Sequence, residues 1–464
     1  MRALLVAALT VGCGSDPGST VDAPPSPTDV TSTDDAPLLD APPDAFIPPA
    51  GPWRVVVAGT NPCAIHTDGR IKCWGSMLGY EVNELHGDEP NEMGTNLPAI
   101  NLGEGLTAKD VVVGSGHACA LFTNGRIKCW GSNQYGQLGL DDTDERGRHA
   151  GDMGNNLPFV DLGTGRTVKA ISASDFNTCA ILDNDRLKCW GHNAAGACGL
   201  GDSNRRGDNP GEMGDALPYV DLGTGRTVKK IFVGTIRACA LLDNDALKCW
   251  GNNFSGVMGQ GQLTTHVGTS PSHMGDNLRP IDLGPNLVAT HVTHQGESIC
   301  ATLTTGAVKC WGRGTEAELA NGIDENLGDE PNEMGAALPF ANLGTNPTSL
   351  AGGASHGCAS FADGSVACWG SNYRGTLGLG LANNDQIGDT AAELGANLPR
   401  VPLAGPVATL HGGQSIFTCA TLVSGHIQCW GWNALGALGL GDDNDRGDDI
   451  AEMGTALPYL DLGP

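Results

Sequence analysis

The pattern of apolar and polar residues predicts short β-strands that recur in groups of four along the chain. In the third group the apolar runs are residues 159–162, 168–172, 179–182 and 187–190, with polar or glycine-rich stretches between them. Pro158 and Gly163 bound the first run, which is typical of a short strand between turns. The last two runs flank the tripeptide Asp-Asn-Asp and predict a β-hairpin. We therefore expect an all-β fold of four-stranded units.

Each predicted hairpin carries the same signature: a cysteine, nine residues, a second cysteine and then Trp-Gly. The signature occurs seven times, and successive first cysteines are 56 to 61 residues apart. A period of this size indicates a repeat architecture with one continuous core rather than two or three separate domains. The 69 glycines and the low aromatic content of 5% suit many short strands joined by tight turns.

The second unit, residues 114–139, reads GSGHACALFTNGRIKCWGSNQYGQLG. It resembles the repeat of the regulator of chromosome condensation family, whose pattern has a glycine, a histidine, a small-apolar strand, an Asp/Asn-Gly turn, an aromatic-Gly pair and Asn-x-x-Gly-Gln-Leu-Gly. The resemblance covers about residues 53–464, and the fifth unit departs most because residues 313–319 lack the asparagine and the second glycine. It implies a seven-bladed β-propeller of four-stranded blades, with seven units available to build it.

A recurrent Leu-Pro-x-x-x-Leu segment suggests how such a ring closes. It stands at 97–102, 157–162, 217–222, 338–343, 398–403 and 457–462, with a variant at 278–283, and no copy precedes Trp53. The first blade therefore lacks its first strand, and the C-terminus carries a spare one. We expect residues 459–462 to pair beside residues 54–57, completing the first blade and removing the exposed edges.

The cysteine pairs face each other if the hairpin is counted outward from its turn. With Gly125 in the left-handed bulge position, Phe122 faces Arg126, and Cys119 then faces Cys129 in a non-hydrogen-bonded pair, where Cα atoms approach to about 4.5 Å. That distance lies at the short end of the range that a disulfide tolerates. We therefore expect seven disulfides within hairpins: Cys63–Cys73, Cys119–Cys129, Cys179–Cys189, Cys239–Cys249, Cys300–Cys310, Cys358–Cys368 and Cys419–Cys429.

These cysteines have two other possible roles, as zinc ligands or as reduced residues of the core. Zinc ligands commonly stand two to four residues apart, so a nine-residue gap does not favour a zinc site. Fourteen reduced cysteines could instead fill buried hairpin positions. Of the two remaining cysteines, Cys198 occupies a position held elsewhere by Val, Leu or Met and is expected to be a small buried hydrophobe.

The other unpaired cysteine, Cys13, belongs to the N-terminal segment. Residues 1–12 have one positive charge, a short apolar run and a small residue before Cys13, which predicts a signal peptide. Gly12-Cys13 resembles a bacterial lipoprotein signal, which implies lipidation of Cys13. Residues 13–52 hold ten prolines and no lysine or arginine, and predict a disordered tether to a propeller at 53–464. We expect an extracytoplasmic monomer, lipid-anchored at a bacterial outer membrane or cell surface, or secreted.

The formal net charge of −26, without a basic patch, argues against nucleic-acid binding. Each repeat also carries a long acidic loop, and the best oxygen-rich cluster is Asp442, Asn444 and Asp448. Calcium binds such clusters, but the spacing is not that of an EF-hand. A solvated loop held to the blade edge by its Met and Leu is the alternative, and we expect no other cofactor.

Varied loops on a regular scaffold usually carry binding specificity. The residues two positions before each first cysteine are expected to ring one end of the propeller; they are Asn61, His117, Asn177, Arg237, Ser298, His356 and Phe417. The sequence has no Gly-x-Ser-x-Gly elbow, phosphate-binding loop or His-Glu-x-x-His motif. We therefore expect a non-catalytic protein that binds a protein or a glycan at the cell surface.

Three alternatives stay open: a structural surface or matrix protein without a discrete ligand, a regulator like a guanine-nucleotide exchange factor, and a hydrolase. The resemblance implies the exchange role, because the family includes an exchange factor for a small GTPase, and it also includes secreted inhibitors of β-lactamase. A signal peptide and disulfides favour the extracytoplasmic functions.

Overall fold

A computed structural model describes residues 52–464, except 60, 77–78, 83 and 263–265. The predicted signal peptide, Cys13 and almost all of the predicted tether lie outside these residues. The described residues belong to one compact unit, Pro48–Pro464. Within them, no helix combines the length and the apolar character that a membrane span needs.

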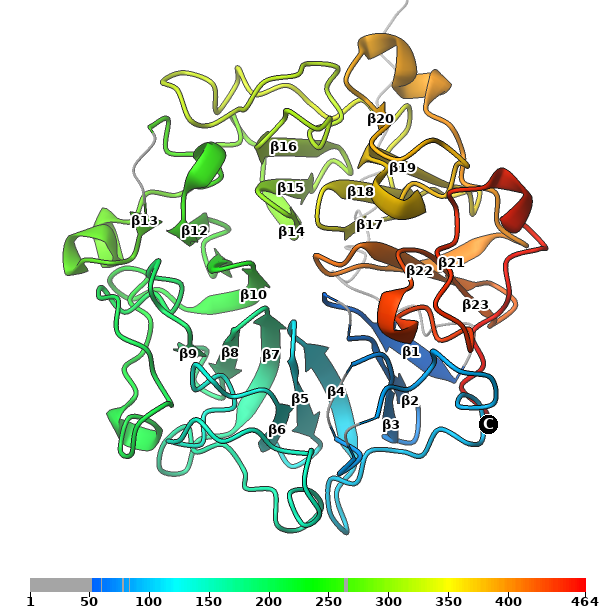
Figure 1. The fold of residues 1–464 in the computed structure, drawn as a ribbon. Helices are drawn as coiled ribbons and strands as arrows, with labels where there is room; N and C mark the ends of the chain where they lie inside the picture. Colours follow the sequence, from blue (N-terminus) through cyan, green and yellow to red (C-terminus); the bar gives the residue numbers. More distant parts are fainter. Residues whose placement is uncertain (1–51, 60, 77–78, 83, 263–265) are drawn as a thin grey trace, which may run out of the picture. The chain divides into compact units, whose positions relative to one another are not determined.

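The described residues form seven antiparallel sheets, which follow one another around a common centre (Figure 1). Sheet 1 contains β1 (Trp53–Val56), β2 (Cys63–His66) and β3 (Ile71–Cys73). Sheet 2 contains β4 (Ala108–Val113), β5 (His117–Phe122) and β6 (Ile127–Gly131), and sheet 3 contains β7 (Val168–Ser174), β8 (Asn177–Leu182) and β9 (Leu187–Gly191).

The next two sheets follow the same order. Sheet 4 contains β10 (Val228–Gly234), β11 (Arg237–Leu242), β12 (Leu247–Asn252) and β13 (His266–Val267), and sheet 5 contains β14 (Ala289–Gln295), β15 (Ser298–Leu303) and β16 (Val308–Gly312). Sheet 6 contains β17 (Ser349–Gly352), β18 (His356–Ser360), β19 (Val366–Ser371) and β20 (Gln386–Ile387), and sheet 7 contains β21 (Val407–His411), β22 (Phe417–Leu422) and β23 (Ile427–Gly431).

Short 3₁₀-helices lie in the long loops that follow the third strands. They are η1 (Gly214–Ala216), η2 (Phe254–Gly256), η3 (Pro271–His273), η4 (Gly275–Asn277), η5 (Tyr373–Gly375), η6 (Ala391–Glu393), η7 (Gly395–Asn397), η8 (Ala434–Gly436) and η9 (Ile450–Glu452). None of these exceeds one turn, so the described fold is all-β, as the strand pattern predicts.

The hairpin register is the one that counting from the turn predicts. In sheet 2, the amide of Phe122 donates to the carbonyl of Arg126, Gly125 has a φ of 75°, and Cys119 lies opposite Cys129. All seven expected pairs are joined as disulfides, with Cα–Cα distances of 4.0 to 4.1 Å. Cys198 is free and buried, also as expected.

The structure contradicts the prediction that each unit begins with a strand of its own sheet, such as residues 159–162 in the third unit. Residues 159–162 form no ladder; Val160 donates one backbone hydrogen bond to Ile127 of the preceding sheet at 3.0 Å. The equivalent Phe340 and Arg400 form single bridges with the third strands of the preceding sheets, at Lys309 and Ala367. The rest of the outer edge is occupied by the segment that directly follows the third strand. It forms β13 and β20 in sheets 4 and 6, and a single bridge in the others: Gly75 with His86, Gly131 with Arg146, Gly191 with Arg206, Gly312 with Leu327 and Gly431 with Arg446.

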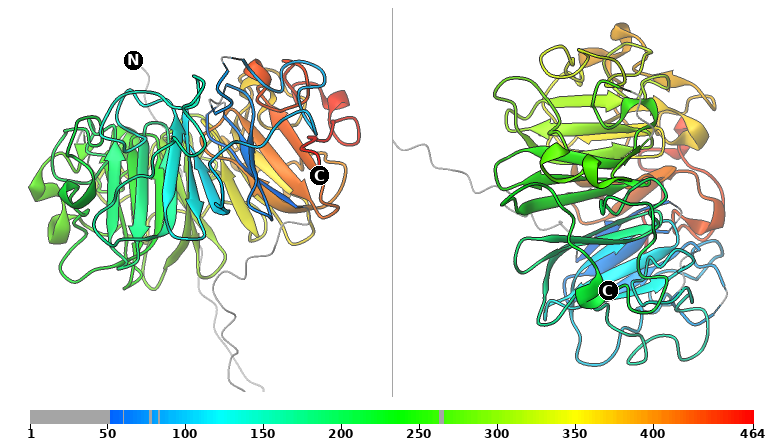
Figure 2. Two further views of the ribbon diagram at one scale, coloured as in Figure 1. Left: turned by 90° about the horizontal axis from the view of Figure 1, so that it is seen from below. Right: turned by 90° about the vertical axis from the view of Figure 1, so that its left-hand side faces the viewer.

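The C-terminal segment also lies elsewhere than expected. The amide of Leu460 donates to the carbonyl of Ile427 in β23 at 2.9 Å, whereas β1 pairs with β2. The predicted pairing of residues 459–462 beside residues 54–57 is therefore wrong. Contact with sheet 1 comes through side chains, since Trp53 Nε1 donates to the carbonyl of Gly463 at 3.0 Å. Figures 1 and 2 mark the C-terminus close to both sheets.

The core consists of seven apolar clusters, each shared by two sheets that follow one another around the centre. One of them joins Trp53 and Val55 of sheet 1 to Phe417 and Ile427 of sheet 7. The seven repeated tryptophans are fully buried, and six of them cross these junctions with a hydrogen bond; the exception among the described residues is Trp130, whose Nε1 has no partner. Trp190 Nε1, for example, donates to the carbonyl of Gln137 at 3.0 Å. Sheet 1 is joined to sheet 7 in the same way, through Trp74 and Ala437.

A buried lysine in the third strand is a second repeated link. Lys128 Nζ donates to the carbonyls of Leu102 and Gly154, each at 2.8 Å, and so ties together the segments that follow sheets 1 and 2. Lys72, Lys188, Lys248 and Lys309 make the equivalent pairs of bonds. Desolvation lowers the pKa of each of these five amines.

Candidate functional site

The seven residues predicted to ring one end of the propeller are not exposed loop tips. All are buried, with at most 2% of each residue exposed: Asn61, His117, Asn177, Arg237, Ser298, His356 and Phe417. They stand at or next to the start of the second strand of each sheet, where the neighbouring sheet covers them. Their burial contradicts the prediction that they are exposed loop tips, although one of them, His356, lines the pocket described below.

Several of these side chains connect neighbouring sheets. His117 Nε2 is 2.9 Å from Thr178 Oγ1 in sheet 3, and His356 makes the same contact with Thr418 in sheet 7. Asn61 donates to the carbonyl of Ser115 in sheet 2. Burial lowers the pKa of both histidines to about 4, so they are neutral at physiological pH.

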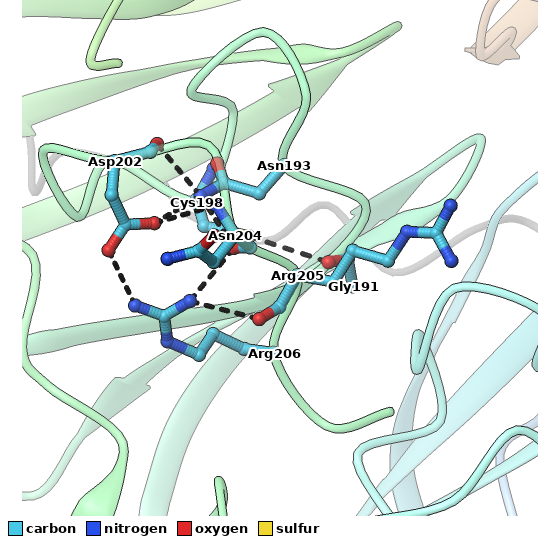
Figure 3. A network of polar contacts seen from close by, with 7 residues as sticks. All are labelled: Gly191, Asn193, Cys198, Asp202, Asn204, Arg205 and Arg206. Carbon is cyan, nitrogen blue, oxygen red and sulfur yellow. Dashed lines mark hydrogen bonds and ion pairs between the residues drawn. The ribbon is translucent and has the colours of Figure 1, made fainter. Parts of the chain in front are cut away.

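The acidic loops are held by a repeated polar network, drawn for sheet 3 in Figure 3. Asn193 Oδ1 accepts from the amide of Cys198 at 2.8 Å, and Asn193 Nδ2 donates to the carbonyl of Asp202 at 3.0 Å. Arg206 Nη2 donates to Asp202 Oδ2 at 2.6 Å, and Arg206 Nη1 donates to the carbonyls of Asn204 and Arg205, both at 2.9 Å. The network therefore fixes the path of the loop.

Two of the three suggested calcium ligands, Asp442 and Asn444, belong to the same network in sheet 7. Asp442 Oδ2 accepts from Arg446 Nη2 at 2.6 Å, while Asp442 Oδ1 accepts from the amide of Asn444 at 2.9 Å and from Asn433 Nδ2 at 3.2 Å. Its carboxylate is thus already paired with a cation and two N–H donors. Among the described residues, no three His, Cys, Asp or Glu side chains gather closely enough to hold a metal ion. The local geometry does not favour a calcium site here.

An open pocket of about 470 Å³ lies where the loops of sheets 5, 6 and 7 meet. We call it the sheet 6 pocket; its lining includes Glu316, Ser355, Tyr373, Asn384, Gln386 and Ile416. The ring of Tyr373 stands at its edge, and 44% of the residue is exposed. The pocket therefore combines an exposed aromatic ring with hydroxyl, amide and carboxylate groups.

Two arginines hold the walls of this pocket. Arg313 Nη2 donates to Ser355 Oγ at 2.8 Å, and Arg313 Nη1 lies 3.3 Å from Glu316 Oε1. Arg313 also pairs with Glu318, whose carboxyl pKa is raised by burial. On the other wall, Arg374 Nη1 lies 3.3 Å from Asp445 Oδ2 of sheet 7. Glu316 is thus held by a cation and keeps its second oxygen for other contacts.

This pocket was not predicted from the sequence, although the sequence contains one indication of it. Residues 313–319 depart most from the repeat pattern, and they supply both Arg313 and Glu316. Where other sheets use an asparagine such as Asn193 to hold the loop, sheet 5 uses the Arg313–Glu318 ion pair. A unit that breaks the repeat was therefore a better indicator of the pocket than positions that vary in every unit.

Comparisons with known proteins support this architecture. Residues 108–137 and 168–197 match one family model, and residues 124–181 match another, both described as the regulator of chromosome condensation (RCC1) repeat. This stretch of the chain, residues 108–197, is similar to RCC1 repeats. The matched residues fall on sheets 2 and 3, so the resemblance read from the second unit is confirmed there.

Curated proteins that are similar in sequence to this chain carry names that describe different functions. The ultraviolet-B receptor UVR8 of Arabidopsis thaliana is 25% identical over 407 residues, which cover 86% of this chain and 81% of the receptor. Protein pim1 of Schizosaccharomyces pombe is 28% identical over 57% of this chain and 46% of its own length. The human E3 ubiquitin-protein ligase HERC2 is 25% identical over 57% of this chain, but that match spans only 5% of the ligase.

Solved structures that share this fold include those of yeast RCC1 and human WBSCR16. Yeast RCC1 (Prp20), bound to Kap60, aligns with a TM-score of 0.61 and 15% identity, covering 88% of this chain and 87% of that one. Human WBSCR16 aligns with a TM-score of 0.57 and 16% identity, covering 78% and 85%. At sequence identities of 15% and 16%, these alignments show a shared fold alone.

Proposed function

We propose that this chain is a non-catalytic binding propeller that works outside the cytosol and holds a carbohydrate in the sheet 6 pocket. The observation that carries the proposal is the exposed ring of Tyr373 beside Asn384, Gln386 and Glu316. An aromatic ring packs against the C–H face of a sugar, while amides and carboxylates hydrogen-bond to its hydroxyl groups. A few polar groups around an apolar contact are the usual composition of a ligand pocket.

The seven disulfides support the compartment. Such bonds persist in oxidising, extracytoplasmic environments and are rare where glutathione keeps thiols reduced. A role on a cytosolic or nuclear GTPase is therefore disfavoured. Lipidation of Cys13 and a bacterial surface location belong to the proposal, and the intact mass of protein taken from its native envelope tests them.

A closed seven-bladed ring is the second part of the proposal. Its support is that sheets 7 and 1 share an apolar cluster and a tryptophan hydrogen bond of the kind found at five of the other six junctions. We expect removal of residues 457–464 to abolish cooperative unfolding, because Leu460 and Leu462 are buried between sheets 7 and 1 and Leu457 is buried between sheets 6 and 7. Unchanged melting of the truncated chain would contradict a closed ring.

The ligand test uses two aromatic residues at equivalent positions. Tyr373 and Phe254 both begin a one-turn 3₁₀-helix after an asparagine, and both are exposed, but Phe254 does not line the sheet 6 pocket. We expect Tyr373→Ala to weaken the binding of glycans selected on an array at least tenfold, and Phe254→Ala to leave it unchanged. Equal losses in both variants, or no binder on the array, would overturn the carbohydrate assignment.

A further inference from the structure

A cavity of about 230 Å³ lies at the centre of the molecule, among the innermost strands in Figure 1. All seven sheets contribute to its lining, from Val56 in sheet 1 to Gln414 after β21. Val112, Phe232 and Leu350 form half-buried apolar walls. This cavity is separate from the sheet 6 pocket, and none of the lining residues is shared.

One end of the cavity is crossed by Gln414. Gln414 lies in the loop after β21 of sheet 7 and has a backbone φ of 55°. Its side chain extends to sheets 3 and 4. Gln414 Oε1 accepts a hydrogen bond from Ser174 Oγ at 3.1 Å and another from Thr235 Oγ1. The amide oxygen is therefore fully used, and the amide nitrogen faces the remaining polar groups.

Three buried polar atoms at this end have no hydrogen-bond partner among the described residues: Thr293 Oγ1, His294 Nδ1 and Gln414 Nε2. All three residues line the cavity, and Thr293 and His294 are only 8% and 7% exposed. A Cβ atom added to Gly234 would lie 2.5 Å from His294 Nδ1 and 2.9 Å from Gln414 Nε2. Both atoms therefore lie against Gly234, on the side to which a Cβ atom would project. An unpaired polar atom that is buried in this way is costly.

The hydrogen-bonding character of these atoms restricts the molecule that would satisfy them. His294 Nε2 is 3.3 Å from the carbonyl of Phe232, so this nitrogen carries the proton and Nδ1 is an acceptor. Burial, with the positive charge of Arg237 nearby, lowers the pKa of His294 to about 3, so the ring stays neutral. Gln414 Nε2 is a donor, and the hydroxyl of Thr293 can act either way.

An anion would present only acceptors and would leave His294 Nδ1 facing a lone pair. A cation would present only donors and would meet the N–H groups of Gln414. A hydroxyl oxygen both donates and accepts, so one such oxygen serves both atoms. A single water would also do this, but the cavity volume corresponds to several waters at about 30 Å³ each and has apolar walls.

We propose that the central cavity binds a small neutral polyol, with one hydroxyl between His294 Nδ1 and Gln414 Nε2 and its carbon chain against Val112, Phe232 and Leu350. The site is independent of the carbohydrate pocket at Tyr373. Its ligand is smaller, because the central cavity has a volume of about 230 Å³ and the sheet 6 pocket about 470 Å³. Few polar groups at the end of an apolar cavity give orientation and specificity.

Titrations of the full disulfide-bonded protein with glycerol, erythritol and glucose, followed by saturation-transfer NMR, test the proposal, with acetate as the anionic probe. We expect saturable binding of at least one polyol and none of acetate. Gly234→Ala adds a methyl group that crowds both His294 Nδ1 and Gln414 Nε2, and Gly234 does not have a positive φ. Gln414→Leu removes the donor. Each substitution is expected to weaken binding roughly tenfold or more, the effect of losing one hydrogen bond.

Two controls separate this site from general effects. Gly405→Ala adds a methyl group where no atom lies within 4 Å, and Tyr373→Ala alters only the sheet 6 pocket; both should keep polyol binding. Thermal unfolding of each variant checks that it folds, and Gln414→Leu provides the answer if Gly234→Ala does not fold. Absence of saturable binding, binding of acetate instead, or density for ordered waters only in soaked crystals would overturn the proposal.

Discussion

Lys72 donates a hydrogen bond of 2.8 Å to the carbonyl of Leu462, a residue 390 positions further along the chain. The same ammonium donates to the carbonyl of Gly94. In sheet 2, Lys128 makes this pair of bonds with Leu102 and Gly154. The C-terminal segment therefore takes, between sheets 7 and 1, the place that residues 97–102 take between sheets 1 and 2.

Replacing Lys72 by methionine should lower the free energy of unfolding by about 2 kcal/mol, because two buried carbonyls lose a charged donor. Urea unfolding measures the effect. Lys109→Met is the control, since Lys109 is exposed and its one hydrogen bond, to the carbonyl of Lys169, is 3.3 Å long. If both substitutions changed stability equally, the lysine link would not be a stabilising junction.

Removing one disulfide by the double substitution Cys119→Ala/Cys129→Ala should cost about 2–3 kcal/mol, since each bond closes a loop of ten residues. Thermal and urea unfolding measure the loss. The comparison is Cys198→Ala, which removes a free thiol and no cross-link.

Alkylation with mass spectrometry gives an independent check on the cysteines. Burial raises the pKa of Cys198 to about 12. In a Cys13→Ser variant, which removes the other unpaired cysteine, we therefore expect no labelling of the native protein at neutral pH and one label after unfolding without reductant. More than one label in that experiment would show that a hairpin pair is reduced.

Acid should destabilise the protein through its buried histidines. The pKa of His117 is about 4 in the folded chain and about 6.5 when unfolded, so the unfolded state binds more protons between these values. The free energy of unfolding therefore falls as the pH drops from 6.5 to 4, by about 3 kcal/mol for this residue.

The comparison of His117→Asn with wild type isolates this contribution. The variant should lose less stability than wild type over that pH range, measured by urea unfolding at each pH. His149→Asn, at an exposed position, should parallel wild type. Parallel curves for both variants would mean that His117 is protonated to the same extent in the folded and unfolded states.

Arg206→Ala should loosen the acidic loop of sheet 3, because Asp202 and two backbone carbonyls lose their donor (Figure 3). We expect faster hydrogen exchange in residues 202–213, and a loss of about 1 kcal/mol in stability. Arg205→Ala removes an exposed side chain from the same loop and should leave exchange unchanged. Equal exchange in both variants would assign the order of the loop to its apolar contacts.

The hairpins were predictable because their register depends on local counting. A turn with Gly125 in the left-handed region fixes which residues face each other, and Cys119 and Cys129 follow. The run at 159–162 was read as a strand because its apolar residues point inward, yet only Val160 forms a backbone bond to the preceding sheet. In this segment apolar side chains are buried without the backbone pairing of a strand. The pattern of apolar residues indicates burial, but it does not indicate backbone hydrogen bonding.

The candidate site depended on contacts between distant residues. His117 and Arg237 looked like variable loop tips, but neighbouring sheets cover both. Conversely, Tyr373 and Glu316 stand 57 residues apart in sequence and meet only because consecutive sheets pack together. Sequence spacing within one unit carries no information about which loops of different units touch.

Every disulfide joins cysteines ten positions apart, inside a single hairpin. Oxidation can therefore proceed one hairpin at a time as a nascent chain emerges, without a long-range search among fourteen thiols. Wrong pairings are disfavoured by proximity alone, so maturation should need little isomerase. The seam between Trp53 and Gly463, in contrast, can form only after Gly463 has been made.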